Sequence, residues 1–258
     1  MMNNRMKDLL VVSIKYYLKV FGFMALLFIA FLAVLLIFGN LFDGGDTPSI
    51  RSMLTGFNFP LLFSAVLIFS QFDQGFLLKL QNGFARGQIF KNDFWMITLV
   101  TVFVTVLNRI LHLSWLGSNP TYNGFFTNPL VNFFALFIIS FLGNYLLFIV
   151  AESLGAFLNL FSKKIRNWIA ILIVAGFLFV SISLFSGAAF GVGMLVSNHV
   201  IDIQMVETIL NLTMSVLFGF NEHGAWNPLN MIVTMLVGSG LLTWLARFII
   251  MRVQIHRI

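Results

Sequence analysis

The chain contains no cysteine among its 258 residues. This absence excludes a disulfide framework, a thiolate metal site and a cysteine nucleophile. Charged residues are also scarce: they make up 9% of the chain, whereas a soluble domain carries about 25%. Hydrophobic residues make up 59%. The composition predicts an integral membrane protein, with a single transmembrane domain over residues 1–258 and no folded soluble domain.

Motifs for catalysis and nucleotide binding are missing as well. No glycine-rich loop ends in Gly-Lys-Ser/Thr, so we do not expect ATP to bind this chain through a P-loop. The four histidines are scattered, and they form no His-Glu-x-x-His pair. We therefore predict no catalytic, cofactor-binding or metal-binding residue in this chain, and we do not expect it to be an enzyme.

Long apolar runs are what the chain does contain. A helix needs about 20 apolar residues to cross the hydrocarbon core of a bilayer, and six runs reach or approach that length. They cover residues 20–42, 57–72, 94–116, 130–151, 168–196 and 229–250. The predicted fold class is an all-α, polytopic membrane protein with six transmembrane helices.

Two further segments have helical patterns outside these runs. Over Met6–Phe21 a narrow polar stripe persists for three turns opposite apolar residues, which predicts a helix in the membrane interface before the first span. The alternative is a basic flank that only fixes topology. Between the fifth and sixth runs, residues 197–228 include a predicted helix over Ile201–Phe220. We expect this helix on the outer side, and a partial seventh crossing is the alternative.

The basic residues predict an orientation. With both termini in the cytoplasm, all of the 15 Lys and Arg residues except Arg51 and Arg109 fall on the cytoplasmic side, as the positive-inside rule requires. This bias and contact with anionic lipids account for the net charge of +6. We therefore do not expect nucleic acid as a partner. The predicted location is the cell membrane, with a multi-pass topology.

Two ionisable residues inside the predicted spans are candidate polar or gating sites. Glu152 lies at the inner end of the fourth run, and an ionisable group at membrane depth indicates function by default. We expect it to pair with a Lys or Arg near the interface rather than to relay protons. Arg109 lies one turn from His112 near the outer end of the third run. Snorkelling to the interface is the simpler interpretation of Arg109, and contact with an anionic group in an exit path is the functional one.

The segment Gln71–Trp95 joins the second and third runs on the predicted cytoplasmic side. Wound as a helix, it places Lys79, Asn82 and Arg86 on one face and apolar side chains on another. An amphipathic basic segment of this kind can lie on the membrane and present a polar face to a soluble partner. The alternative is an inert anchor that fixes topology.

Residues Gln81–Lys91 read QNGFARGQIFK. They resemble the segment that joins the second and third spans in membrane permeases of ABC exporters of the second type, particularly the small six-span permeases of Gram-positive bacteria. Gly87 and Gln88 depart from the polar or basic pair that is commoner in that family. The family's layout also fits the whole chain. The residues that match the family segment are Asn82, Gly83, Arg86, Ile89, Phe90 and Lys91.

The resemblance implies an ATP-driven exporter in which two permease chains, identical or different, enclose a pathway. Separate ATPase subunits, which would bind the ATP and magnesium, would dock on the cytoplasmic face. Gln74–Lys91 would act as the coupling helix. The aromatic-rich spans suit a cargo such as an amphipathic peptide or a lipid-like molecule. The expected ATPase-coupling residues are Lys79, Asn82, Gly83, Arg86, Phe90 and Lys91.

Other functions stay open. An ATP-independent secondary transporter would need a pair of intramembrane carboxylates or helices broken at the midplane, and the sequence offers only Glu152 for the former. An intramembrane protease would need a Glu/His or Ser/His set within the spans, which is not found. A non-transporting immunity or assembly protein could use the same fold without a cargo.

Overall fold

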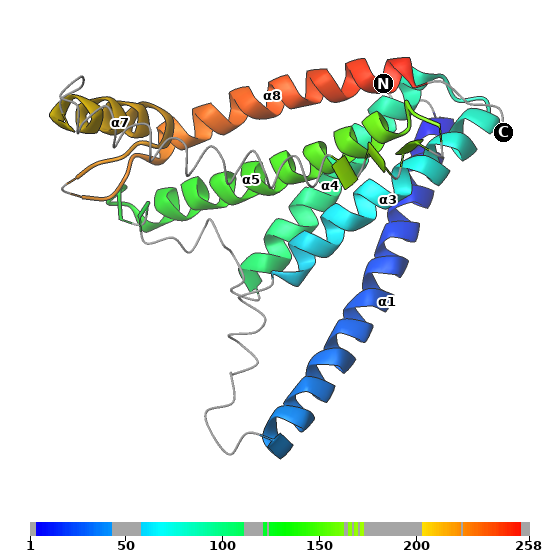
Figure 1. Ribbon diagram of the computed structural model, residues 1–258, viewed down its shortest axis with the longest axis horizontal. Coiled ribbons are helices and arrows are strands. Elements are labelled where there is room, and N and C mark those ends of the chain that lie inside the picture. The colour runs from blue at the N-terminus through cyan, green and yellow to red at the C-terminus, as the bar shows by residue number, and fades with distance from the viewer. Residues whose placement is uncertain are drawn as a thin grey trace.

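The fold is described by a computed structural model, and every regular element in its described residues is a helix (Figure 1). These residues contain no strand, so the all-α prediction is confirmed for them. The described residues are 4–42, 58–110, 121–122, 124–162, 165–166, 168–169, 171–172, 203–222 and 224–253. The helices are α1 (Asn4–Phe42), α3 (Phe59–Gln81), α4 (Arg86–Ile110), α5 (Pro129–Leu158), α7 (Ile203–Phe218) and α8 (Pro228–Arg252).

Several of these helices are long and apolar enough to cross a membrane. Within the described part of the chain four helices meet this condition, in α1, α4, α5 and α8. The two halves of α3, which bend by 42°, make a fifth if they count as one span. This is consistent with the predicted membrane protein. The predicted run 168–196 lies almost entirely outside the described residues, so the number of six spans is not confirmed.

The N-terminal region is one uninterrupted helix. α1 has 39 residues, a length of about 59 Å at 1.5 Å per residue. The sequence predicts an interfacial helix and then a span at 20–42. In the structure, Met6–Phe31 of α1 is long and apolar enough to cross a membrane, and it runs across the predicted boundary between the two segments. No proline interrupts this sequence, so nothing in it stops the helix between the two predicted segments. A separate interfacial helix is therefore not confirmed.

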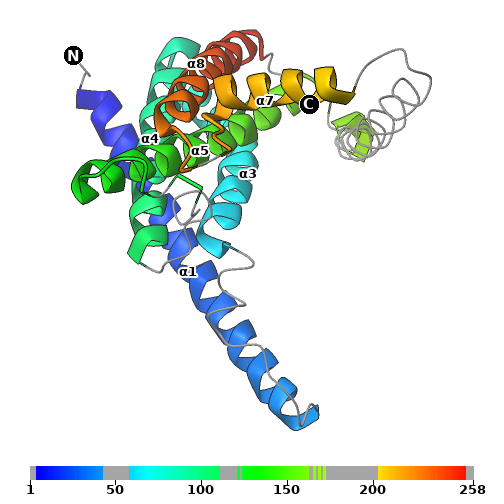
Figure 2. The same cartoon turned by 90° about the vertical axis from the view of Figure 1, so that its left-hand side faces the viewer.

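The N-terminal half of α1 packs against the other helices. Tyr17 and Phe21 are buried, and the Tyr17 hydroxyl is hydrogen-bonded to Ser64 of α3. Beyond this contact α1 diverges from the bundle, as Figures 1 and 2 show. Several large apolar side chains of the diverging part are exposed, including Leu26 and Phe31.

The centre of the bundle is α5, which packs against α3, α4 and α8. Apolar side chains such as Phe148 and Ile149 of α5 and Ile97 of α4 are fully buried there. The same faces also carry polar side chains, and two residues of α5 form hydrogen bonds to neighbouring helices. The Asn144 amide of α5 donates to Thr105 of α4 at 2.9 Å, and the hydroxyls of Tyr145 and Thr243 are 3.0 Å apart between α5 and α8.

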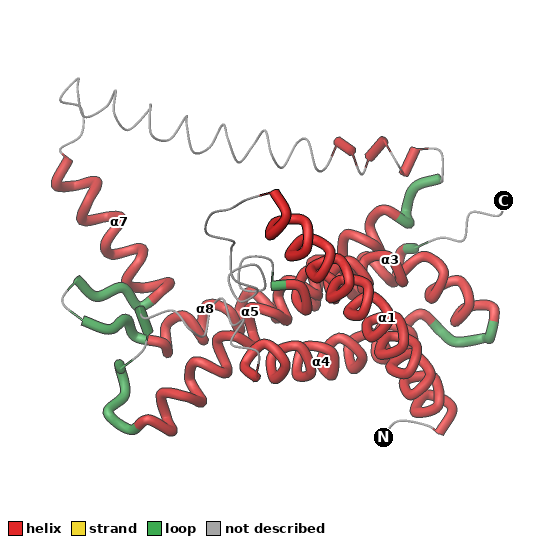
Figure 3. The backbone as a smooth tube through the Cα atoms, turned by 90° about the horizontal axis from the view of Figure 1, so that it is seen from below, coloured by secondary structure: helices red, strands yellow, loops and turns green. Residues whose placement is uncertain are grey.

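At one end of the bundle α7 is followed by α8, and the two ends of their connection lie close together, since the Asn227 amide donates to the Gly219 carbonyl at 2.8 Å. Figure 3 shows α7 set at an angle beyond the N-terminal end of α8. The helix predicted over Ile201–Phe220 is thus present as α7, whose 16 residues are fewer than the about 20 that a full crossing needs. Tyr122 donates to the carbonyl of Phe218 at 3.0 Å, and this ties α7 to the loop before α5. Burial raises the pKa of the Tyr122 phenol above its ordinary value, so the donor keeps its proton at neutral pH.

Candidate functional site

The opposite end of the bundle carries the connection between α3 and α4. α3 ends at Gln81 because the chain turns through Gly83, which has a φ of +77°. The Phe84 amide donates to the Lys79 carbonyl at 3.1 Å and the Gly83 amide to the Leu80 carbonyl at 2.9 Å. This pair of bonds is the Schellman motif that closes a helix on a glycine. Gln74–Lys91 is therefore a helix end, a turn and a helix start, and not one continuous helix.

α4 begins with a side-chain cap. The Gln88 side-chain oxygen accepts a hydrogen bond from the Ala85 amide at 3.0 Å, which satisfies one of the amides that a helix N-terminus leaves unpaired. Gln88 is one of the two residues that depart from the pattern of the ABC exporter permeases, and in this structure its side chain caps the N-terminus of α4. Since the turn separates α3 from α4, Lys79, Asn82 and Arg86 do not lie on one helical face.

The six residues expected to couple to an ATPase differ in their exposure. Asn82, Gly83 and Lys91 are exposed, whereas Arg86 and Phe90 are half-buried. The Lys79 side chain is 13% exposed and forms an ion pair with Asp93 of α4. Lys79 thus lies inside the bundle, beneath the turn. Of the six residues, Asn82, Gly83 and Lys91 are therefore the ones open to a partner at the turn.

Arg86 fastens the start of α4 to the end of α8. Its guanidinium donates to the Met251 carbonyl at 2.9 Å, one of the carbonyls that a helix C-terminus leaves without an intrahelical partner. A cation also interacts favourably with the negative end of the helix dipole at this place. The turn, α4 and α8 are therefore tied together at this end.

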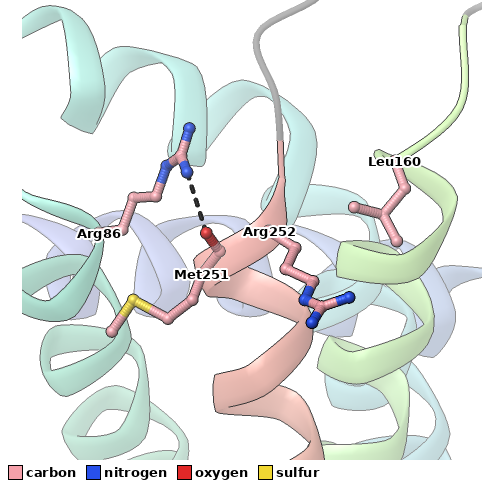
Figure 4. Close-up of a pocket in the computed structure, with 4 residues that line it drawn as sticks. All are labelled: Arg86, Leu160, Met251 and Arg252. Atoms are coloured by element: carbon pink, nitrogen blue, oxygen red, sulfur yellow. Dashed lines mark hydrogen bonds between the residues drawn. The ribbon is translucent and has the colours of Figure 1, made fainter.

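An open pocket of about 560 Å³ lies next to this contact and is lined by Arg86, Leu160, Met251 and Arg252. Figure 4 shows the two arginines on opposite sides of the α8 end. The Arg252 guanidinium lies 4.1 Å from the centre of the Phe248 ring, a distance typical of a cation–π contact. With two guanidinium groups in its wall, the pocket favours an anionic group.

Beneath the turn, four polar side chains form what we call the buried charge cluster: Lys79, Asn92, Asp93 and Glu152. The Asp93 carboxylate accepts from Lys79 and, at 3.1 Å, from the Asn92 amide. Glu152 of α5 is 2% exposed, and neither of its oxygens has a hydrogen-bond partner among the described residues. The charges of Asp93 and Lys79 both act on Glu152, with opposite signs.

Asn92 and Asp93 are the residues of this cluster that the sequence analysis does not predict. Glu152 was expected to pair with a Lys or Arg, and Lys79 does lie within its electrostatic reach, but the hydrogen-bonded pair is Lys79 with Asp93. One signal was available in the sequence. Asp93, Thr101, Thr105 and Asn108 follow helical spacing on α4, and all of them are buried. This spacing marks a polar face that turns inward.

Arg109 lies far along α4 from the cluster, in the last turn of that helix. It is half-buried, and its guanidinium is 5.6 Å from the centre of the Phe133 ring near the start of α5. The structure does not bring the two candidate intramembrane residues, Glu152 and Arg109, together. His112 lies outside the described residues.

No group of three or more His, Asp or Glu side chains that could hold a metal ion occurs in the described part of the chain. Comparison with protein-family models, curated proteins and solved structures found no match. The fold and the site therefore define a class only. The chain is a helical bundle with several helices suited to a membrane, a capped turn with exposed polar residues at one end and a buried charge cluster beneath it.

Proposed function

We propose that this chain is the membrane permease subunit of an ABC exporter, energised by separate ATPase subunits that bind the ATP and magnesium. The observation that supports this most is the construction of the α3–α4 turn. It is exposed at its tip, closed by hydrogen bonds at its base and fastened to α8 through Arg86. A force applied to such a turn is transmitted to three helices at once.

The docking surface in this proposal differs from the one that the sequence pattern predicts. Its exposed part is Asn82, Gly83 and Lys91, and the pocket between Arg86 and Arg252 lies beside it. This surface is suited to acidic residues on an ATPase. Lys79 and Phe90 would act from inside, Lys79 through its ion pair and Phe90 through packing against the apolar clusters beneath the turn.

The remaining parts of the proposal follow the same layout. The turn and both termini face the cytoplasm, the chain crosses the cell membrane six times and the run 168–196 supplies one of the crossings. A second permease chain, identical or different, completes the pathway against the exposed apolar faces of α1 or α8. The cargo is an amphipathic peptide or a lipid-like molecule.

Co-purification from native membranes tests the proposal. The full chain should recover an ATPase with a P-loop sequence, and the double variant Asn82→Asp with Lys91→Glu should recover about tenfold less or lower still, since like charges across an interface cost several kcal/mol. The matched control is Asn4→Asp with Lys19→Glu on α1, which makes the same charge change at exposed positions. Equal recovery by all three proteins, or no ATPase with the unaltered chain, contradicts the proposal.

Lys79→Glu is unsuitable for this test. It would place a third carboxylate beside Asp93 and Glu152 in a buried site, and the resulting repulsion would disturb the bundle whether or not an ATPase docks. Loss of binding by that variant would therefore carry no information about the docking surface.

A second candidate function is ATP-independent transport driven by a proton gradient. Such a transporter needs a pair of intramembrane carboxylates, and Asp93 and Glu152 supply the pair that the sequence did not predict. Transport by purified protein in vesicles separates the two functions. A proton-driven transporter works without any ATPase and stops when a protonophore removes the gradient, whereas the permease subunit alone moves no cargo.

A further inference from the structure

Glu152 presents a problem that neither the turn nor the pocket explains. It is 2% exposed, and neither carboxylate oxygen has a hydrogen-bond partner in the described part of the chain. An ionised carboxylate in such surroundings loses its hydration without gaining donors in return, at a cost of several kcal/mol. A carboxyl group in this position is far more stable with a proton bound.

The charges around Glu152 lead to the same conclusion. The buried charge cluster holds one cation, Lys79, and two acids, Asp93 and Glu152. With both acids ionised the cluster would carry a net negative charge in the interior, and with one proton bound it is neutral. A buried net charge without a charge of opposite sign beside it is strongly disfavoured. The cluster therefore requires one bound proton.

The hydrogen bonds decide which acid holds that proton. Asp93 accepts from the Lys79 ammonium and the Asn92 amide, and both contacts stabilise its ionised form. Glu152 accepts from neither of them. The proton therefore belongs to Glu152.

The described helices that pack against α5 agree with this assignment. α3 contributes Lys79 and α4 contributes Asp93, as described above. α5 itself contributes the Tyr145 phenol, whose hydroxyl is engaged with Thr243 of α8. The arginines of α8, Arg247 and Arg252, have exposed side chains. None of these groups offers Glu152 a cation of its own.

We propose that Glu152 is a proton-binding site, which holds one proton at neutral pH while α3, α4 and α5 are packed as here and releases it when these helices separate and water reaches the carboxyl. The site lies directly beneath the α3–α4 turn, because Lys79 belongs to the last turn of α3. Opening of this end of the bundle would thus be linked to release of a proton. The proposal stands whether ATP or a proton gradient drives transport.

The chain is well suited to a direct measurement because it contains only three glutamates, Glu152, Glu207 and Glu222. The latter two are exposed to solvent, so neither lies in surroundings like those of Glu152. Infrared spectra of the full chain, with its glutamates labelled with ¹³C at the side-chain carboxyl, distinguish glutamic acid from aspartic acid by the shift of the carbonyl band.

At pH 7 we expect a protonated-carboxyl band that shifts with the glutamate label and disappears in Glu152→Gln. The control Glu207→Gln, the same substitution at an exposed position, should keep the band. Asp93→Asn should weaken it, because Lys79 then becomes available to Glu152 as a partner.

The absence of a label-sensitive band from the unaltered protein would overturn the proposal, and that result does not depend on how any variant folds. A band of full strength in folded Glu152→Gln would also overturn it, and one in folded Asp93→Asn would overturn the role of Lys79 and Asp93 in placing the proton. Since the spectra involve no ATPase and no cargo, their outcome is separate from that of the docking experiment.

Discussion

The inner and outer helices of the bundle bury very different fractions of their residues. In an apolar stretch of 18 residues from each helix, 44% of the residues of α4 and 50% of those of α5 are buried, against 11% in both α1 and α8. The inner pair encloses polar side chains, including the buried charge cluster. The outer pair turns large apolar side chains outward, such as Phe23 of α1 and Trp244 of α8. A soluble protein has the opposite arrangement, with apolar side chains inside and polar ones outside. The arrangement seen here is expected if lipid or another apolar chain surrounds the bundle.

This difference in burial indicates which positions of the chain determine the packing of the helices. Inner positions are fixed by hydrogen bonds and charge balance, which tolerate few substitutions. Outer positions need only be apolar, since a lipid tail is as good a neighbour as a leucine. Substitutions should therefore cost most at the cluster, less at the turn and between α4 and α5, and least on the outer faces.

The largest effect is expected for Lys79→Met. It leaves the Asp93 carboxylate buried without its cation, and breaking a buried pair from one side costs about 3–5 kcal/mol. Thermal or denaturant unfolding in detergent measures the loss. Lys19→Met, at an exposed position on α1, should change stability by less than about 0.5 kcal/mol. Similar losses in the two variants would mean that the ion pair contributes little to stability. They would contradict the expectation that substitutions cost more at buried inner positions than at exposed outer ones.

The next effect is expected at the turn, for Gly83→Ala. Gly83 has a φ of +77°, and an L-residue in a left-handed conformation costs about 1–2 kcal/mol. The matched control is Gly22→Ala in α1, where an added methyl group meets nothing within 4 Å and should stabilise the helix by about 0.5–1 kcal/mol. Opposite signs of the two changes in the same unfolding assay are the expected result. Equal signs would contradict the account of how α3 ends.

A smaller effect is expected for the hydrogen bond between α4 and α5. In a double-mutant cycle with Asn144→Leu and Thr105→Val, the coupling energy should be about 0.6 kcal/mol and at most about 1.7, the range found for such bonds within membranes. Additive changes, with no coupling, would show that the two helices are held by packing alone. The inner pair would then owe its stability to apolar contacts rather than to its polar bridges.

The smallest effect is expected on the outer face of α8, for Leu241→Ala. Leu241 is 63% exposed, so a single chain in detergent should lose less than about 0.5 kcal/mol. The same variant measured in lipid sharpens the comparison. A loss of about 2 kcal/mol or more there would show that this face is packed against a second chain, because large-to-small changes reach that cost only in a packed interface or core.

The helices themselves were largely predictable from the sequence. The runs 94–116, 130–151 and 229–250 overlap α4, α5 and α8. A helix that crosses a membrane needs a long apolar run, and such a run is visible in the sequence. The starts of α5 and α8 also carry a local signal, because Asn128-Pro129 and Asn227-Pro228 each place a capping Asn before a Pro in the first turn. α4 begins earlier than the run predicts, because its first turns are polar and are paired at the cluster and at α8.

The site was only partly predictable. The Asn-Gly pair at residues 82–83 marks the end of α3, yet the helical pattern on either side favoured one continuous amphipathic helix. The local sequence indicates a surface cation at Lys79, because neither its ion pair with Asp93 nor its small exposure is visible there. Glu152 was recognised as an unusual group at membrane depth. Its nearest charges come from two other helices, and only the packed bundle brings them together.

If an ATPase docks at the α3–α4 turn, photocrosslinking in native membranes should capture it there. A photoreactive amino acid is placed at the exposed position of Asn82 and, in a control protein, at the exposed position of Glu222, beyond the other end of the bundle. The proposed function predicts a crosslink from position 82 to a protein with a P-loop and none from position 222. A P-loop protein captured from position 222 and not from position 82, or from neither position, would contradict it.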